Sequence, residues 1–151
     1  MADANIDRDL SQLTADDLQA LRAAADSGDV MSMHQVAVCY EHGYGVTQNV
    51  RNAAKYFRLA AEAGEKGAMA AMARLSFLGK GVVQDSEDAA DWVKKAAAAG
   101  HADSQFNLGE MYAFGRVVNA DASLAAQWYE KAAAQGHALA LEKLADEKFD
   151  V

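Results

Sequence analysis

The sequence predicts an all-α fold, a right-handed α-solenoid in which antiparallel helix pairs stack one on the next. The first observation is a spacing of thirty-six residues that recurs along most of the chain. It is kept by Gly28, Gly64, Gly100 and Gly136, by Val46, Val82 and Val118, and by Ala60-Ala61, Ala96-Ala97 and Ala132-Ala133. A fixed period of about 20–50 residues is typical of repeat proteins, whose units bury their apolar faces against each other. The second observation is that the 151 residues include abundant alanine and no proline, which are the best and the worst helix formers.

The chain is expected to begin with half a unit, at residues 14–28. Thr14 and Asp17 resemble a capping box, in which two side chains satisfy free backbone N–H groups at the start of a helix. The helix that follows ends in AAADSG, in register with LAAEAG at the end of the first repeat. It therefore matches the second helix of an incomplete unit, and such half-units cover the exposed ends of a solenoid.

Three whole repeats follow, at residues 29–64, 65–100 and 101–136, each with two helices joined by a loop. A glycine is expected to close each first helix, because glycine adopts the left-handed conformation at low cost. An Asn or Asp is expected to cap each second helix. The glycines are Gly43, Gly79 and Gly115, and the capping residues are Asn49, Asp85 and Asp121. A further glycine gives the loop freedom at Gly45 and Gly81, but Val117 replaces it in the third repeat.

Each second helix carries small side chains with one larger residue between them, at spacings of four and three that place them on one face. The sets are Ala53, Phe57 and Ala60, then Ala89, Val93 and Ala96, then Ala125, Tyr129 and Ala132. Because small side chains let two helices approach closely, this face is expected to be buried. Residues 137–148 then repeat the register of a first helix and are expected to form the closing half-unit.

The third repeat contains, in this order, Leu-Gly, Tyr, Gly, Val and Asp, followed by Trp-Tyr, Ala-Ala and Gly-His. These are Leu108-Gly109, Tyr112, Gly115, Val118, Asp121, Trp128-Tyr129, Ala132-Ala133 and Gly136-His137. Over about residues 24–145 the chain resembles the Sel1-like repeat proteins, relatives of the tetratricopeptide repeat proteins. Two departures are Ser76, where Tyr is usual, and Val117, where Gly is usual. The resemblance implies an adaptor or scaffold rather than an enzyme.

Charge, cysteine content and hydropathy narrow the possible functions. The net charge is −8 and no basic stripe is present, which argues against a nucleic-acid partner. The single cysteine, Cys39, cannot form an intrachain disulfide, and no apolar run is long enough for membrane insertion. We expect a cytoplasmic protein, or a periplasmic or secreted one if the sequence is a processed form. A monomer or a weak homo-oligomer is expected.

No pattern of residues predicts catalysis, a metal or a cofactor. The sequence has no Gly-x-Ser-x-Gly or Ser-x-x-Lys nucleophile motif, and LGKGVV at 78–83 is not a phosphate-binding loop. Cys39 and His42 have a spacing found in zinc sites. However, Cys39 occupies the repeat position of Leu75 and Met111, so we expect it in the core.

The most suitable surface for a partner is the concave side, which the first helices line in tetratricopeptide-like solenoids. In the repeat register, Val36, Met72 and Leu108 are expected to be the inward anchors of the first helices. The register predicts a groove lined by His34, Val38 and His42, by Arg74, Phe77 and Leu78, and by Phe106, Glu110 and Phe114. The apolar members would form a strip with polar edges, which is typical of an interaction site.

The leading hypothesis is a non-enzymatic scaffold or adaptor that binds a partner protein or peptide in this groove and could regulate or neutralise it. Two alternatives stay open. One is a hydrolase or binder related to the cell wall or peptidoglycan, against which the missing catalytic residues argue. The other is a structural oligomer of solenoids joined end to end, which the molecular mass at several concentrations would reveal.

Overall fold

The structure, a computed structural model, describes residues 9–149, and this part of the chain is helical throughout. A short 3-10 helix, Leu10–Gln12, precedes eight α-helices, and none of the described residues forms a strand. The α-helices are α1 (Ala15–Asp26), α2 (Val30–His42), α3 (Val50–Glu62), α4 (Lys66–Leu78), α5 (Ser86–Ala98), α6 (Ala102–Phe114), α7 (Ala122–Ala134) and α8 (Ala138–Phe149). The predicted fold class, a right-handed α-solenoid of antiparallel helix pairs, is confirmed.

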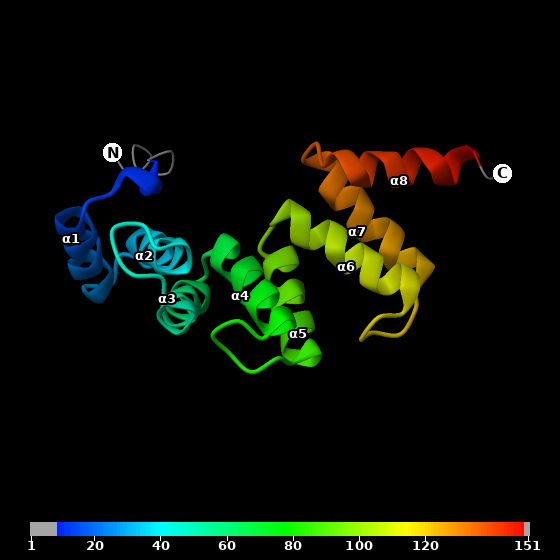
Figure 1. Ribbon diagram of the computed structural model, residues 1–151. Coiled ribbons are helices and arrows are strands. Elements are labelled where there is room, and N and C mark those ends of the chain that lie inside the picture. The colour runs from blue at the N-terminus through cyan, green and yellow to red at the C-terminus, as the bar shows by residue number, and fades with distance from the viewer. Residues whose placement is uncertain (1–8, 150–151) are drawn as a thin grey trace.

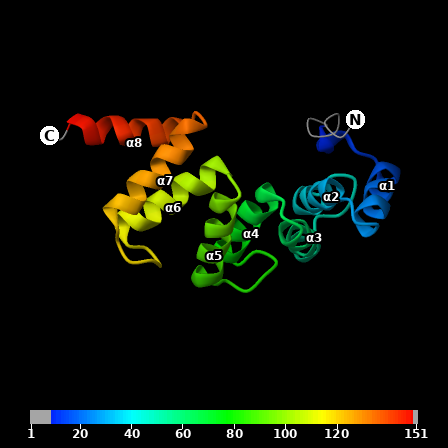
Figure 2. The ribbon, with the colours of Figure 1, turned by 180° about the vertical axis from the view of Figure 1, so that it is seen from behind.

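The helices pack in the order in which they occur along the chain. Figure 1 shows the pairs α2–α3, α4–α5 and α6–α7 in succession, with α1 and α8 at the two ends, and Figure 2 shows the same order from behind. These three pairs are the first, second and third repeats. Each pair is in contact mainly with its neighbours in the chain, which is the packing expected of a repeat protein.

Local sequence signals decide where the helices begin and end. Glycines in the left-handed conformation end the first helices, as predicted. They are Gly43, Gly79 and Gly115, with φ of 77°, 68° and 63°. The side chains of the predicted caps accept hydrogen bonds from the first turn of the second helices. These caps are Asn49, Asp85 and Asp121. Thr14 and Asp17 form the predicted capping box at the start of α1.

The residue at one repeat position caps the helix that follows it, and the type of side chain differs between repeats. This position is occupied by Asp29, Glu65, His101 and His137 in chain order. The carboxylates of Asp29 and Glu65 accept hydrogen bonds from backbone N–H groups of α2 and α4. His101 and His137 accept such bonds through Nδ1, from the N–H groups of Ser104 and Ala140. The two histidines therefore cap helices, as the two carboxylates do.

The small residues of the second helices are buried, as predicted. Four of them have no exposed surface: Ala53, Ala60, Ala96 and Ala132. One cluster of buried apolar side chains extends from Leu13, ahead of α1, to Trp92 in α5. The buried side chains of the third repeat, including Leu108 and Tyr129, do not belong to that cluster. The cluster therefore ends within the second repeat, because buried alanines of α5 such as Ala96 also lie outside it.

Candidate functional site

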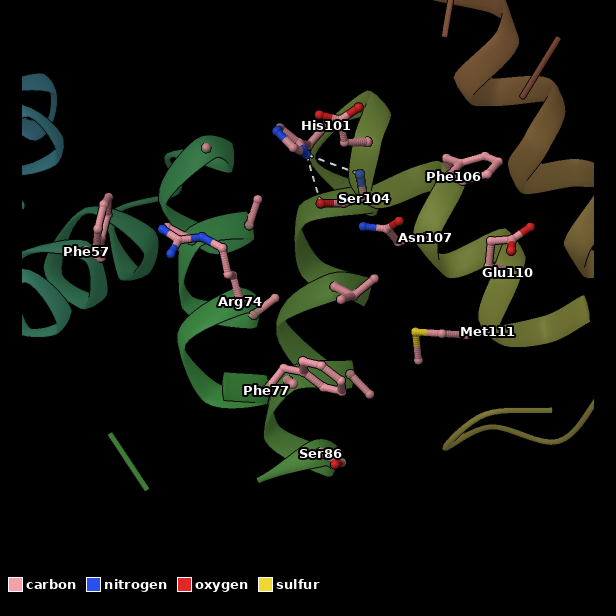
Figure 3. Close-up of a pocket in the computed structure, with 18 of the residues that line it drawn as sticks. Phe57, Arg74, Phe77, Ser86, His101, Ser104, Phe106, Asn107, Glu110 and Met111 are labelled. Carbon is pink, nitrogen blue, oxygen red and sulfur yellow. Dashed lines mark hydrogen bonds between the residues drawn. The ribbon is translucent and has the colours of Figure 1, made fainter. Parts of the chain in front are cut away.

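A groove of about 840 Å³ lies across all three repeats. The first helices α2, α4 and α6 contribute to its walls, as the register predicts. Residues of α3 and α5, and of the loop between α6 and α7, line it as well. Its volume is in the range of binding sites, about 300–1,000 Å³, and most of its lining is apolar. Figure 3 shows the side chains that face the groove.

Two residues of α4, one turn apart, give this wall its character. The side chain of Phe77 is 59% exposed and extends over α5 into the groove (Figure 3). Arg74 extends the other way, toward the first repeat, and its Nη1 lies 2.6 Å from Oε1 of Glu41 on α2. The α4 wall therefore combines a large exposed apolar side chain with an ion pair.

His34 and Glu65 form the edge of the groove at the first repeat. His34 Nδ1 lies 2.5 Å from Glu65 Oε2, and the imidazole packs edge-on against Phe57 at 5.4 Å between ring centroids. Burial raises the pKa of Glu65. The hydrogen bond and charge of His34 and the N–H groups of Gly67 and Ala68 lower this pKa by a larger amount. The pKa of Glu65 is therefore below its ordinary value. The carboxylate both caps α4 and ties it to α2.

The α6 wall presents residues that the register did not predict. Asn107 and Met111 extend from α6 into the groove (Figure 3). Phe106 also lines the groove, but its ring extends toward α7. Its centroid lies 4.9 Å from that of His137 and 5.6 Å from that of Tyr129. Phe106 therefore packs between elements of the solenoid as well as bordering the groove.

Glu110 has a similar double position. It lines the groove, and its Oε1 accepts a hydrogen bond of 2.5 Å from the hydroxyl of Tyr129 on α7. The same oxygen lies 3.3 Å from Nζ of Lys143 on α8. These contacts tie α6 to the two helices that follow it. The carboxylate is therefore held in place at the groove edge.

The structure brings together six of the nine residues predicted for the groove. Those that line it are His34, Val38, Arg74, Phe77, Phe106 and Glu110. His42, Leu78 and Phe114 are exposed but do not line it. His42 stacks on Tyr44, and Phe114 lies beneath the cationic groups of Arg116 and Lys143. Contact with a partner stays a prediction for all nine residues, and the geometry favours the six that line the groove over these three.

The register also missed the contribution of α5. Ser86, Ala89, Ala90 and Val93 face the groove, although a second helix is expected to pack against neighbouring repeats. Val117, in the loop after α6, lines the groove beside them. The one sequence signal for this arrangement was the replacement of a loop glycine by Val117.

The repeat unit of this structure has a family counterpart. The family model of the Sel1 repeat matches the chain three times, at residues 30–65, 67–101 and 102–137. The chain belongs to the Sel1 repeat family. The predicted resemblance is thus confirmed over all three helix pairs.

Solved structures of Sel1 repeat proteins have the same fold. A Sel1 repeat protein from Oxalobacter formigenes is 40% identical, with a TM-score of 0.81, over 86% of this chain and 98% of that chain. A protective antigen of uropathogenic Escherichia coli strains, which displays an SLR fold, is 28% identical, with a TM-score of 0.78, over 83% of this chain and 27% of that one. Helicobacter pylori cysteine rich protein B is 25% identical, with a TM-score of 0.58, over 62% of this chain and 71% of its own. A comparison with curated proteins gave no match.

The family determines the general class of function. Sel1 repeats are generally scaffolds for protein–protein interaction, and the fold is generally non-catalytic. In the part of the chain that the structure describes, no three His, Cys, Asp or Glu side chains are grouped to hold a metal ion. No helix within residues 9–149 is long and apolar enough to cross a membrane.

Proposed function

We propose that this Sel1 repeat protein is a non-enzymatic adaptor that holds a segment of a partner protein in its groove and regulates or neutralises that partner. The observation that carries the proposal is the exposed ring of Phe77 within a groove that spans three repeats. An exposed aromatic side chain at the centre of an apolar groove with polar edges is typical of a protein-binding site.

The lining indicates the chemistry of the bound segment. A large apolar side chain of the partner fits beside Phe77 and Met111, where the alanines of α4 and α5 leave space. The side-chain amide of Asn107 is exposed and can donate to and accept from a peptide backbone. Arg74 and Glu41 present both signs of charge at one edge, so they orient the segment more than they hold it.

Several titratable side chains of the groove are engaged in contacts within the solenoid. His34 is engaged by Glu65, and the ring nitrogen of His101 is engaged by Ser104. Glu110 is held by Tyr129 and Lys143. The titratable side chains therefore maintain the shape of the groove.

The test compares two exposed apolar neighbours on α4, of which one lines the groove and one does not. Wild type, Phe77→Ala and Leu78→Ala serve as baits in a cell lysate, and peptides from any protein lost with Phe77→Ala are then titrated by calorimetry. Removing an aromatic anchor typically costs about 2 kcal/mol or more, so Phe77→Ala is expected to weaken binding by at least about tenfold. Leu78→Ala is expected to bind nearly as wild type.

Circular dichroism must show the same helix content in all three proteins. Equal affinity of wild type and Phe77→Ala for every isolated partner would contradict binding in the groove. Loss with Leu78→Ala instead would move the site to the neighbouring face of α4.

A further inference from the structure

One position in the inter-helix loop has the same backbone conformation in all three repeats. Gly45, Gly81 and Val117 occupy it, with φ of 67°, 72° and 63°. This left-handed region suits glycine and is rare for a β-branched residue. Among the described residues, Val117 is the one residue other than glycine with a positive φ. The loop therefore keeps its conformation in the third repeat although the residue is unfavourable for it.

In the first two repeats, this position lies against the preceding part of the chain. A Cβ atom added to Gly81 would be 2.2 Å from the carbonyl oxygen of Val50, at the start of α3, and 3.2 Å from Cβ of Ala54. A Cβ added to Gly45 would be 3.0 Å from the carbonyl oxygen of Thr14, just before α1. The absence of a side chain thus allows each loop to lie directly on the preceding unit.

The third repeat cannot make the same contact. Because Val117 shares the backbone conformation of Gly81, its Cβ takes the direction that in the second repeat leads to the start of the preceding helix. The residues thirty-six positions after Val50 and Ala54 are Ser86 and Ala90 in α5. Val117, Ser86 and Ala90 all line the groove, and Val117 and Ser86 are exposed.

Between the second and third repeats, the His–carboxylate pair found at the neighbouring junctions has no counterpart, although the amide of Gln135 donates to the carbonyl of Gly100 at 2.9 Å. His34 and Glu65 join the first repeat to the second. Asp103 and His137, at 2.8 Å, join the third repeat to α8. The same two registers pair His101 with Ala70 or with Gly67, neither of which can bind an imidazole. The amide of Gln105, which donates to the carbonyl of Ala97 at 3.2 Å, does cross this junction.

We propose that Val117 is a spacer that holds the third repeat away from the start of α5 and so sets the width of the groove. The side chain keeps Ser86 and Val93 accessible from the groove, where a closed junction would cover them. The inference rests on the proposed function and deepens it, because a partner segment in the groove would reach α5 through this opening. It is nevertheless a statement about the shape of the free protein and is tested without a partner.

Spin-label distances across the two loop contacts provide the test. One label pair, Glu87→Cys with Asn119→Cys, spans the contact of the third repeat, and the pair Arg51→Cys with Val83→Cys occupies the same repeat positions one repeat earlier. All four sites are exposed, whereas Cys39 is fully buried, so the labels react at the introduced cysteines. Distances between labels are measured in wild type, Val117→Gly and Val117→Ala backgrounds.

Val117→Gly is expected to shorten the 87–119 distance toward that of the 51–83 pair. Val117→Ala keeps Cβ, the atom that the inference makes responsible, and is expected to leave the distance close to that of wild type. Gly81→Val is expected to lengthen the 51–83 distance; if this variant does not fold, the Val117 variants decide alone. An unchanged mean distance in Val117→Gly, including one with a merely broader distribution, would overturn the proposal. Higher stability of Val117→Gly is no support, because relief of the backbone conformation alone would produce it.

Discussion

At the scale of single residues, Gly109 in α6 shows how one position depends on its neighbour across the helix pair. A Cβ atom added to Gly109 would lie 2.7 Å from two ring carbons of Tyr129 on α7. The Tyr129 hydroxyl donates to Glu110, and its ring packs against Phe106, so it has little freedom to move aside. The glycine is therefore required by the bulk of the opposing tyrosine.

Gly109→Ala is accordingly expected to destabilise the protein. Overpacking a filled interface costs about 1–3 kcal/mol, and alanine returns about 1 kcal/mol of helix propensity. The net loss in the free energy of unfolding, measured by urea denaturation, is therefore expected to be up to about 2 kcal/mol. The second repeat has Ala73 and Val93 at these two positions. Gly109→Ala should thus be less harmful in a Tyr129→Val background, and equal effects in the two backgrounds would contradict the proposed clash.

Ser76 is the other departure from the family pattern, and its contacts explain how a serine fits there. Tyrosines occupy this repeat position at Tyr40 and Tyr112, and Tyr40 stacks on Tyr56 with ring centroids 6.0 Å apart. Ser76 is fully buried, and its hydroxyl donates to Oδ2 of Asp88 on α5 at 2.6 Å. A buried hydroxyl needs such a partner, so the serine replaces ring packing by a hydrogen bond within the same helix pair.

At the scale of helices, Glu65 connects the start of α4 to α2. Its carboxylate accepts hydrogen bonds from α4 and from His34, and its pKa is lowered from the ordinary value of 4.5. A carboxyl group with a lowered folded-state pKa stabilises the fold above its unfolded-state pKa. That contribution is lost as the pH falls through the folded-state pKa.

Glu65→Gln is therefore expected to be less stable than wild type near neutral pH, with the difference decreasing as the pH falls below about 4.5. Chemical denaturation of both proteins at a series of pH values measures this difference. Glu62→Gln, at the exposed end of α3, is the matched control and should differ little from wild type throughout. If the stability advantage of wild type over Glu65→Gln increased in acid, the ionised carboxylate of Glu65 would not be the stabilising form, and the prediction would be wrong.

At the scale of the whole molecule, the break in the buried cluster predicts unequal stability along the solenoid. In a repeat protein, stability is approximately a sum of units and of interfaces between neighbours. The cluster that begins at Leu13 includes Met72 in α4 but not Leu108, which occupies the same repeat position in α6. The junction between these helices also lacks the His–carboxylate pair found at the two neighbouring junctions.

Native-state hydrogen exchange is expected to show α6 and α7 opening more readily than α2 and α4. The amide of Leu108 should exchange at least about tenfold faster than that of Met72 after correction for intrinsic rates. Both residues are at the centre of a first helix and are buried, so the comparison is matched. Equal protection of the two amides would mean that the solenoid unfolds as one cooperative unit.

The sequence by itself determined the fold and the ends of its helices. The thirty-six-residue period, the helix-closing glycines and caps such as Asn49 are local signals, because backbone conformation and hydrogen bonding at a helix end involve residues a few positions apart. The buried face of the second helices follows equally from helical spacing, as the full burial of Ala96 and Ala132 shows. The division into half-units and repeats by residue number stays a prediction.

Only the tertiary structure decided which side chains face the groove. The register treats every repeat as equivalent. It therefore predicts Phe106 in the groove and omits Asn107, whereas Asn107 extends into the groove and the ring of Phe106 extends toward α7 (Figure 3). Phe106 contacts His137 and Glu110 contacts Lys143, both far away in sequence, and the register does not reveal these contacts. Val117 was visible as a departure from the pattern. Its consequence was not, because the oxygen that an added side chain would meet belongs to the preceding repeat, about thirty residues earlier in the chain.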